Sequence, residues 1–264
     1  FGQREAMETL VYLVEVRGIR DSRPLIDTFA EVFRKDMFTY SVEHQTTMDG
    51  RRQIRRYFPE LDADGLQDLP PENLRRYAFK MATGSGKTVV MAMIIVWCYF
   101  HRKLVPGSDL STNFLIVPPN VIVYQRLEKD FANNRIFYEL PLVPPEWQWN
   151  MKPILRGEST EPDPSGNLFL TNIQQLYESR DEEWTPLNAV DAVLGRKPVK
   201  DLASHQRSML ERLKSLPDLV ALNDEAHHVH DEYLAWYKTL IALHQSILGG
   251  LSLWLDFSAT PKDQ

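Results

Sequence analysis

A glycine-rich run, Thr83-Gly84-Ser85-Gly86-Lys87-Thr88, contains the residues of this chain best suited to phosphate chemistry. Its two glycines allow the backbone to curl, so that several N–H groups converge on phosphate oxygens. Lys87 would add a point charge beside the β- and γ-phosphates, and the Thr88 hydroxyl is a suitable Mg²⁺ ligand. The general phosphate-loop pattern has another glycine five positions before the second glycine, where this chain has Met81. The match to that pattern is therefore partial.

A second group of reactive side chains, Asp224-Glu225-Ala226-His227, follows the apolar run 217–223. One carboxylate can hold a hydrated Mg²⁺ and the other can polarise an attacking water. We expect Asp224 to share the metal with Thr88, and Glu225 to activate the water. Ligands of an open parallel sheet bind beyond the carboxyl ends of its strands. The acidic pair and the glycine-rich run are therefore expected to face one nucleotide.

Each reactive group lies beside an apolar run of strand length or a helical pattern, which indicates an α/β fold. The predicted parallel sheet would be flanked by helices, with the glycine-rich run between a strand and a helix. Strands are predicted at 77–82, 113–117, 167–170, 217–223 and 251–257, and helices at 3–16, 89–100 and 121–131.

The composition is that of a soluble globular protein, with 43% hydrophobic and 25% charged residues. No apolar run reaches membrane-spanning length. Cys98 is the single cysteine, which excludes an internal disulfide, and its helical context favours core packing over a nucleophilic role. The net charge of -6 argues against coating of nucleic acid by bulk electrostatics, so any contact with a polynucleotide should be local. Without a signal peptide or an initiator methionine, the chain is interpreted as a fragment of a cytoplasmic protein.

Three motifs in this order, Gly84-Ser85-Gly86-Lys87-Thr88, Asp224-Glu225-Ala226-His227 and Ser258-Ala259-Thr260-Pro261, resemble motifs I, II and III of superfamily 2 helicases and translocases. The stretches Lys80-Met81-Ala82-Thr83 and Thr171-Asn172-Ile173-Gln174-Gln175-Leu176 resemble the helicase (Res) subunit of type III restriction enzymes. The resemblance implies a single RecA-like P-loop NTPase lobe over 1–264 that binds ATP and Mg²⁺. It further implies a motor on DNA of restriction or phage-defence type.

The same resemblance also assigns roles in adenine recognition, coupling and nucleic-acid binding to other residues. Phe1 and Gln3 match an aromatic and a glutamine that recognise adenine, although a polar helix start also explains Gln3. The residues expected to couple the state of the nucleotide to motif III by hydrogen bonding are His227, Ser258 and Thr260. Capping of the following helices explains two of the nucleic-acid candidates equally well. Those candidates are Pro119, Asn120, Gln125, Thr171, Asn172 and Gln174.

Two segments, 20–73 and 180–216, exceed what a minimal lobe needs and are predicted as insertions. Within the first we expect a helix near 29–33, another over 53–57 and an acidic linker over 61–71. The second insertion should end in an amphipathic helix over 203–213. Four arginines of the first insertion form either a local nucleic-acid surface or a solvated helix face balanced by nearby acids. They are Arg51, Arg52, Arg55 and Arg56, and the acids are Glu60, Asp62 and Asp64.

The proline-rich stretch 141–150 cannot be regular helix, and we expect its Trp147 and Trp149 to pack on the lobe rather than stack on bases. A cluster of potential metal ligands follows Glu225 in the sequence and consists of His227, His228, His230 and Asp231. A zinc site is not expected there because no cysteine accompanies these residues.

Superfamily 2 motors, which this chain resembles, need an arginine finger from a second lobe, and the sequence ends three residues after Pro261. We therefore expect the chain alone to bind nucleotide weakly and to hydrolyse it poorly. The second RecA-like lobe, any nuclease domain and any modification or defence-system subunit would be partners. Two alternatives stay open: a nucleotide-gated switch that binds DNA or protein without unwinding, and an RNA helicase lobe.

Overall fold

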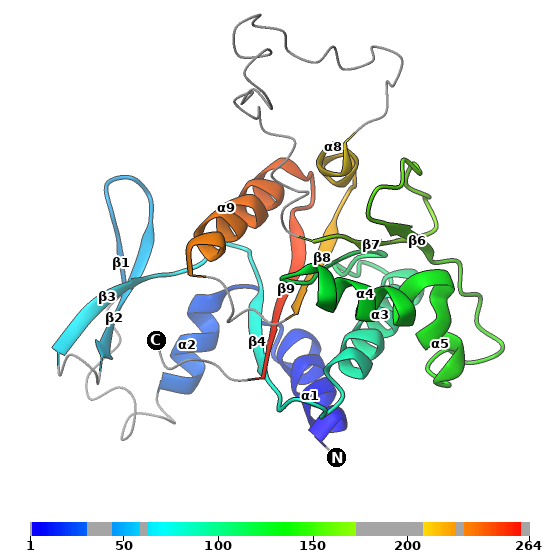
Figure 1. The fold of residues 1–264 in the computed structure, drawn as a ribbon. Helices are drawn as coiled ribbons and strands as arrows, with labels where there is room; N and C mark the ends of the chain where they lie inside the picture. Colours follow the sequence, from blue (N-terminus) through cyan, green and yellow to red (C-terminus); the bar gives the residue numbers. More distant parts are fainter. Residues whose placement is uncertain (1, 31–43, 59–62, 173–207, 225–229, 260–264) are drawn as a thin grey trace, which may run out of the picture.

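The computed structural model describes residues 2–30, 44–58, 63–172, 208–224 and 230–259 (Figure 1). Its centre is a six-stranded sheet in the order β4-β9-β8-β5-β7-β6, and every neighbouring pair in it is parallel. The predicted α/β fold with a parallel sheet is thereby confirmed. The strands are β4 (Arg76–Lys80), β5 (Asn113–Val117), β6 (Lys152–Leu155), β7 (Asn167–Leu170), β8 (Leu219–Asp224) and β9 (Leu251–Ser258).

Helices cover both faces of this sheet, and successive strand residues alternate between two hydrophobic clusters. Phe114 and Ile116 of β5 join one cluster, and Leu115 and Val117 join the other. The first cluster contains α1 (Gly2–Val11), the π-helix Tyr12–Val16, α3 (Lys87–Leu104), α4 (Val121–Phe131) and α5 (Arg135–Glu139), with the 3-10 turn Ala132–Asn134 between the last two. The second contains α8 (Met209–Lys214) and α9 (His230–Ser246).

Helix α3 is the most deeply buried helix of the first cluster. Met91, Ile94, Ile95 and Cys98 are all fully buried along it. Burial raises the pKa of the Cys98 thiol far above its ordinary value, so the thiol stays protonated. The predicted core role of this cysteine is confirmed.

A separate antiparallel sheet, β1 (His44–Thr46), β2 (Arg52–Phe58) and β3 (Ala63–Asp68), follows α2 (Ser22–Ala30). Two predictions were wrong here, because the helix expected over 53–57 is β2 and the linker expected over 61–71 contains β3. Arginines spaced four apart share one side of a strand as well as of a helix, so their spacing cannot separate the two structures. The turn between β1 and β2 contains Asp49-Gly50, a hairpin signal, with Gly50 at φ +80°.

Carboxylates other than the predicted ones balance part of the basic cluster. Arg52 donates from two nitrogens to Asp21 at 2.9 and 2.7 Å, and Arg51 donates to Asp49 at 2.7 Å. These contacts favour the interpretation of the cluster as an ion-paired surface.

Helix α8 covers the end of the helix predicted over 203–213, and residues 203–207 of that prediction lie outside the described residues. Ser208 has extended backbone dihedrals and caps the helix, so that the first helical residue is Met209. The capping box is complete, because the Ser208 hydroxyl accepts from Glu211 N and the Glu211 carboxylate accepts from Ser208 N.

Trp149 packs on the lobe, as predicted, and Trp147 contacts it while remaining 42% exposed. The Trp149 ring lies 4.7 Å from Tyr99 and 4.6 Å from Phe137, and Trp147 lies 4.5 Å from Phe100, between ring centroids. Among the helices that the structure describes, none combines the length and the apolar character required to cross a membrane.

Candidate functional site

The glycine-rich run forms the connection from β4 to α3, as the sequence indicated. Gly84 and Gly86 have φ of +76° and +94°, in the left-handed region that favours glycine. Gly86 is the N-cap of α3 and offers no side-chain oxygen to the N–H groups of the first turn. A helix start of this kind is suited to an anion that accepts from backbone N–H groups.

Lys87 and Asp224 meet at the carboxyl edge of the sheet. The Lys87 Nζ lies 3.9 Å from Asp224 Oδ1, and the side chains are only 8% and 1% exposed. Asp224 is the last residue of β8, and β9 separates that strand from β4. The lysine of the loop and the first carboxylate of the acidic pair therefore share one site, whereas Glu225 lies outside the described residues.

A third charged group at this site was missed by sequence reasoning. Arg126, on α4, donates from Nη2 to Asp224 Oδ2 at 2.9 Å. No motif or spacing rule joins a residue of α4 to the end of β8, because the contact depends on how α4 packs over the sheet edge.

The end of β9 is tied to the base of the loop. The backbone N–H of Met81 donates to Ser258 O at 2.9 Å, and the rings of Phe79 and Phe257 stack with centroids 4.8 Å apart. Ser258, a predicted coupling residue, therefore lies beside the loop, and the other two, His227 and Thr260, are outside the described residues.

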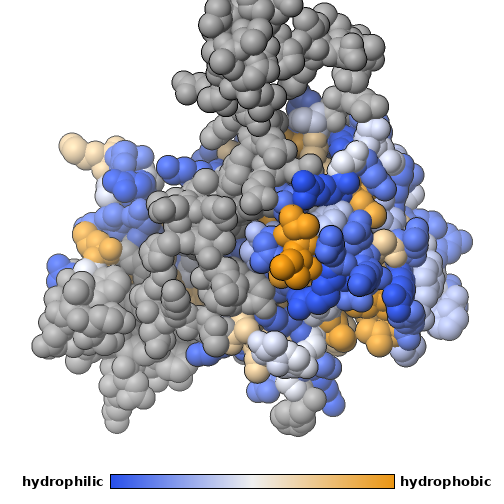
Figure 2. All heavy atoms as spheres, viewed as in Figure 1, coloured by the Kyte–Doolittle hydropathy of each residue, from blue (hydrophilic) through white to orange (hydrophobic). Residues whose placement is uncertain are grey.

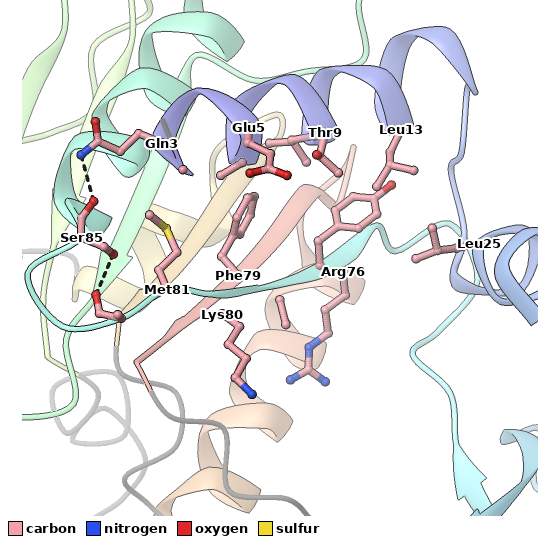
Figure 3. A pocket seen from close by; sticks show the side chains of 16 residues that line it. Gln3, Glu5, Thr9, Leu13, Leu25, Arg76, Phe79, Lys80, Met81 and Ser85 are labelled. Atoms are coloured by element: carbon pink, nitrogen blue, oxygen red, sulfur yellow. Dashed lines mark hydrogen bonds between the residues drawn. The ribbon is translucent and has the colours of Figure 1, made fainter. Parts of the chain in front are cut away.

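Gln3 contacts the loop directly (Figure 3). Its Nε2 donates to Ser85 O at 2.9 Å, and the Ser85 hydroxyl donates to Ala82 O at 2.6 Å. A Cβ atom at Gly86 would lie 2.1 Å from the same Nε2. The Gln3 side chain can move aside, so the left-handed φ of +94° is the stronger reason for a glycine at this position.

A cavity of about 690 Å³ extends from this contact between α1 and β4, as far as Leu25 of α2. Gln3 and Ser85 line its loop end, and Phe79 lines it from the sheet. The cavity offers space for a nucleobase beside Gln3, and the adenine role of Gln3 stays a prediction. Phe1, its predicted aromatic companion, is outside the described residues.

Asp256 anchors the three strands next to the site and was also missed by sequence reasoning. Its Oδ1 accepts from Trp254 Nε1 at 2.9 Å and from Asn223 Nδ2 at 3.1 Å, and its Oδ2 accepts from Arg76 Nε at 2.8 Å. The Arg76 guanidinium also lies over the Trp254 ring, 4.4 Å from its centroid. Because Asn223 directly precedes Asp224, this network helps to position the carboxylate of the site.

Three of the nucleic-acid candidates, Pro119, Asn120 and Gln125, lie at or near the start of α4. Asn120 is the N-cap and its Oδ1 accepts from Val123 N at 2.9 Å, so capping accounts for it, and Gln125 is exposed. Pro119 precedes this cap. Figure 2 shows a hydrophobic area at the start of this helix, where Val121 is 44% and Ile122 80% exposed. This surface is therefore apolar as well as polar.

The candidates after β7 are placed differently. Thr171 and Asn172 are both 0% exposed, and the Thr171 hydroxyl donates to Asn172 O at 3.4 Å. Gln174 is outside the described residues. A contact between this segment and a nucleic-acid backbone stays a prediction.

The donor set fits a nucleoside triphosphate with Mg²⁺. The uncapped start of α3 and the Lys87 amine would supply positive charge for phosphate oxygens, and Asp224 would supply a buried oxygen ligand for the metal. Thr88 is half-buried in the first turn of α3, and its part in holding the metal stays a prediction.

Comparison with protein families gives a match to the model described as type III restriction enzyme, res subunit, over residues 25–263. A comparison with curated proteins gives no match. The matched family is a helicase-type, ATP-dependent motor family, and the parallel sheet flanked by helices fits its RecA-like P-loop NTPase fold. The chain therefore belongs to the type III restriction enzyme res subunit family.

Proposed function

We propose that this chain is the ATP-binding lobe of a motor that hydrolyses ATP to translocate on DNA, in a restriction or phage-defence system. The observation that carries the proposal is the meeting of Lys87 and Asp224, 3.9 Å apart, beside a left-handed glycine loop at the start of α3. A buried pair of this kind at the carboxyl edge of a parallel sheet is the arrangement that a bound triphosphate and its metal require.

The residues have distinct roles in this proposal. Lys87 neutralises charge on the β- and γ-phosphates, Thr88 and Asp224 hold Mg²⁺, and Glu225 orients and deprotonates the attacking water. When bound, Mg²⁺ supplies charge neutralisation for the transferred phosphoryl group. Gln3, with Phe1, holds the adenine at the loop end of the cavity.

In this proposal, the conformational change that follows hydrolysis passes through the end of β9. His227, Ser258 and Thr260 sense departure of the γ-phosphate and pass the change to the polynucleotide contacts at Asn120 and its neighbours. The Met81 N to Ser258 O hydrogen bond of 2.9 Å supports this route, because it joins the phosphate loop to β9 directly.

We also propose that residues 1–264 form one RecA-like lobe carrying insertions at 20–73 and 180–216. The separate hydrogen bonding of the β1-β2-β3 sheet supports the first insertion. A second RecA-like lobe would supply the arginine finger, and a nuclease domain or a modification subunit would supply the cutting or recognition functions. A cytoplasmic location suits such an assembly.

The deciding experiment measures steady-state ATP hydrolysis by the full-length protein with single-stranded DNA, duplex DNA or RNA. A DNA translocase is expected to be stimulated by DNA, and Lys87→Ala and Glu225→Gln should each abolish the stimulated rate. Lys214→Ala, at an exposed lysine of α8, is the matched control and should leave the rate unchanged.

Other results would favour the alternatives. Hydrolysis that is indifferent to every polynucleotide would support a nucleotide-gated switch, and stimulation by RNA alone would support an RNA helicase. Full activity of Lys87→Ala would refute the proposed site altogether.

A further inference from the structure

Two cations share the Asp224 carboxylate, one on each oxygen. Lys87 Nζ lies 3.9 Å from Oδ1, and Arg126 Nη2 lies 2.9 Å from Oδ2. Only the Arg126 contact has hydrogen-bonding distance and a charged donor, which makes it the stronger of the two. Of these two cations, Arg126 makes the closer contact with the carboxylate.

The pair is strongly asymmetric in its exposure to water. The Asp224 side chain is 1% exposed, whereas the Arg126 side chain is 55% exposed. A carboxylate removed from water needs a positive partner, because its own hydration has been lost. A guanidinium that is already half in solvent can withdraw and complete its hydration at little cost. Arg126 is therefore the partner able to leave.

The helix that carries Arg126 is firmly packed. Tyr124, Leu127 and Phe131 of α4 are buried in the first hydrophobic cluster, and the Tyr124 hydroxyl accepts from Arg156 N at 3.2 Å. Withdrawal of the guanidinium is consequently a side-chain movement, and it does not require α4 to shift.

We infer that Arg126 is the resident counter-cation of Asp224 in the metal-free protein and that Mg²⁺ must displace it from Oδ2 to bind. The inference rests on the proposed function, which assigns Asp224 to the metal. A divalent cation approaching this carboxylate meets the positive charges of Lys87 and Arg126, and like charges at such distances repel. Expulsion of Arg126 removes the nearer charge and frees the oxygen. Arg126 therefore sets the Mg²⁺ concentration at which the site loads.

The test is a Mg²⁺ titration of the full chain at a fixed concentration of a fluorescent ADP analogue, with binding followed by anisotropy. Arg126→Gln should lower the Mg²⁺ concentration at the binding midpoint by about tenfold. A change of this size corresponds to about 1.4 kcal/mol of repulsion between the guanidinium and the metal. Arg126→Lys keeps the charge and should stay near the wild-type midpoint. Lys129→Gln removes a charge from an exposed position on the same helix and should leave the midpoint unchanged.

Thermal unfolding gives a second measurement that does not depend on nucleotide. In EDTA, Arg126→Gln should melt roughly 2–4 °C below the wild type, because the buried carboxylate loses the Arg126 cation. Added Mg²⁺ alone should narrow this difference, because the metal replaces the missing cation. A purely structural arginine would instead give the same difference with and without the metal.

The outcomes separate the inference from the proposal on which it rests. A wild-type chain that binds the ADP analogue with Mg²⁺ dependence, together with an Arg126→Gln midpoint that is unchanged or raised, overturns the inference alone. A wild-type chain without any Mg²⁺-dependent nucleotide binding overturns the proposed function as well.

Discussion

Removal of the Asp256 carboxylate should destabilise the protein more than loss of any exposed ion pair. This carboxylate is 6% exposed and accepts from Trp254 Nε1, Asn223 Nδ2 and Arg76 Nε. The donors come from β9, β8 and β4, so that one side chain holds the three strands that carry the site. We take Asp256→Ala as the perturbation.

The magnitude follows from what the substitution leaves behind. Two neutral donors lose their acceptor, on Trp254 at 0% and Asn223 at 5% exposure, and an unsatisfied buried donor costs about 1–3 kcal/mol. The Arg76 guanidinium, whose side chain is 21% exposed, loses its anion. Breaking a buried pair by removing one partner costs about 3–5 kcal/mol, and we expect the total to fall in that range because water can relieve part of the loss. The melting temperature should fall by roughly 10 °C.

A double-mutant cycle read by urea unfolding tests the origin of this energy. Arg76→Met keeps the apolar stem against the Trp254 ring while removing the charge. The double variant Arg76→Met, Asp256→Ala should be more stable than the sum of the single effects predicts, by about 1–3 kcal/mol. Glu139→Ala breaks an exposed pair with Arg135, of 59% and 55% exposed side chains, and should cost under about 0.5 kcal/mol.

The reasoning would be refuted by either of two results. The first is a loss on Asp256→Ala no larger than that of Glu139→Ala. The second is strict additivity in the cycle, since it would mean that Arg76 and Asp256 do not interact energetically.

Three further changes have defined outcomes. Gly86→Ala forces a left-handed residue and a Cβ at 2.1 Å from Gln3 Nε2, so it should lower stability by about 1–3 kcal/mol in thermal unfolding, and an unchanged melting temperature would contradict the loop geometry. Cys98 should resist iodoacetamide at pH 8 in the folded protein and react once urea unfolds it, because burial raises the pKa of its thiol; rapid labelling of the folded chain would argue against this. Burial lowers the pKa of His244 below its unfolded value of about 6.5, and its Nδ1 accepts from Leu251 N at 3.0 Å. As the pH falls, the unfolded chain binds the proton first, so the contribution of His244 to stability is full above about pH 6.5 and is lost below it. Urea unfolding midpoints measured from pH 7.5 to 5.5 should therefore vary less in His244→Gln than in the wild type, and an equal pH dependence in both would exclude His244 as its cause.

The central strands could be predicted because a parallel strand covered on both faces is a continuous apolar run. The bounds predicted for Asn113–Val117 and Asn167–Leu170 are those observed for β5 and β7. The same signal is weak at the sheet edge, where β6 was not predicted. That strand contains Pro153, and proline is tolerated only where no neighbouring strand needs its N–H.

The small antiparallel sheet could not be inferred from charge spacing. Its second strand alternates Ile54, 5% exposed, with the exposed Arg55, which is the period of a half-buried strand. Arginines at intervals of four obscured that period, and the hairpin signal at Asp49-Gly50 was the one local feature that distinguished strand from helix.

The charged groups of the site are of two kinds. Some are positioned by the end of the strand beside them in the sequence, and others by how elements pack in three dimensions. Lys87 and Asp224 could be predicted together because each follows a strand of one parallel sheet, and all such strands end at the same edge. Arg126 and Asp256 belong to the second kind. Their partners depend on which strand lies beside which and on the face that α4 turns to the edge, and neither is encoded in a spacing. The motifs therefore predicted that Lys87 and Asp224 lie together, whereas the Arg126 contact to Asp224 and the Asp256 network beside it come from residues that the motifs do not contain.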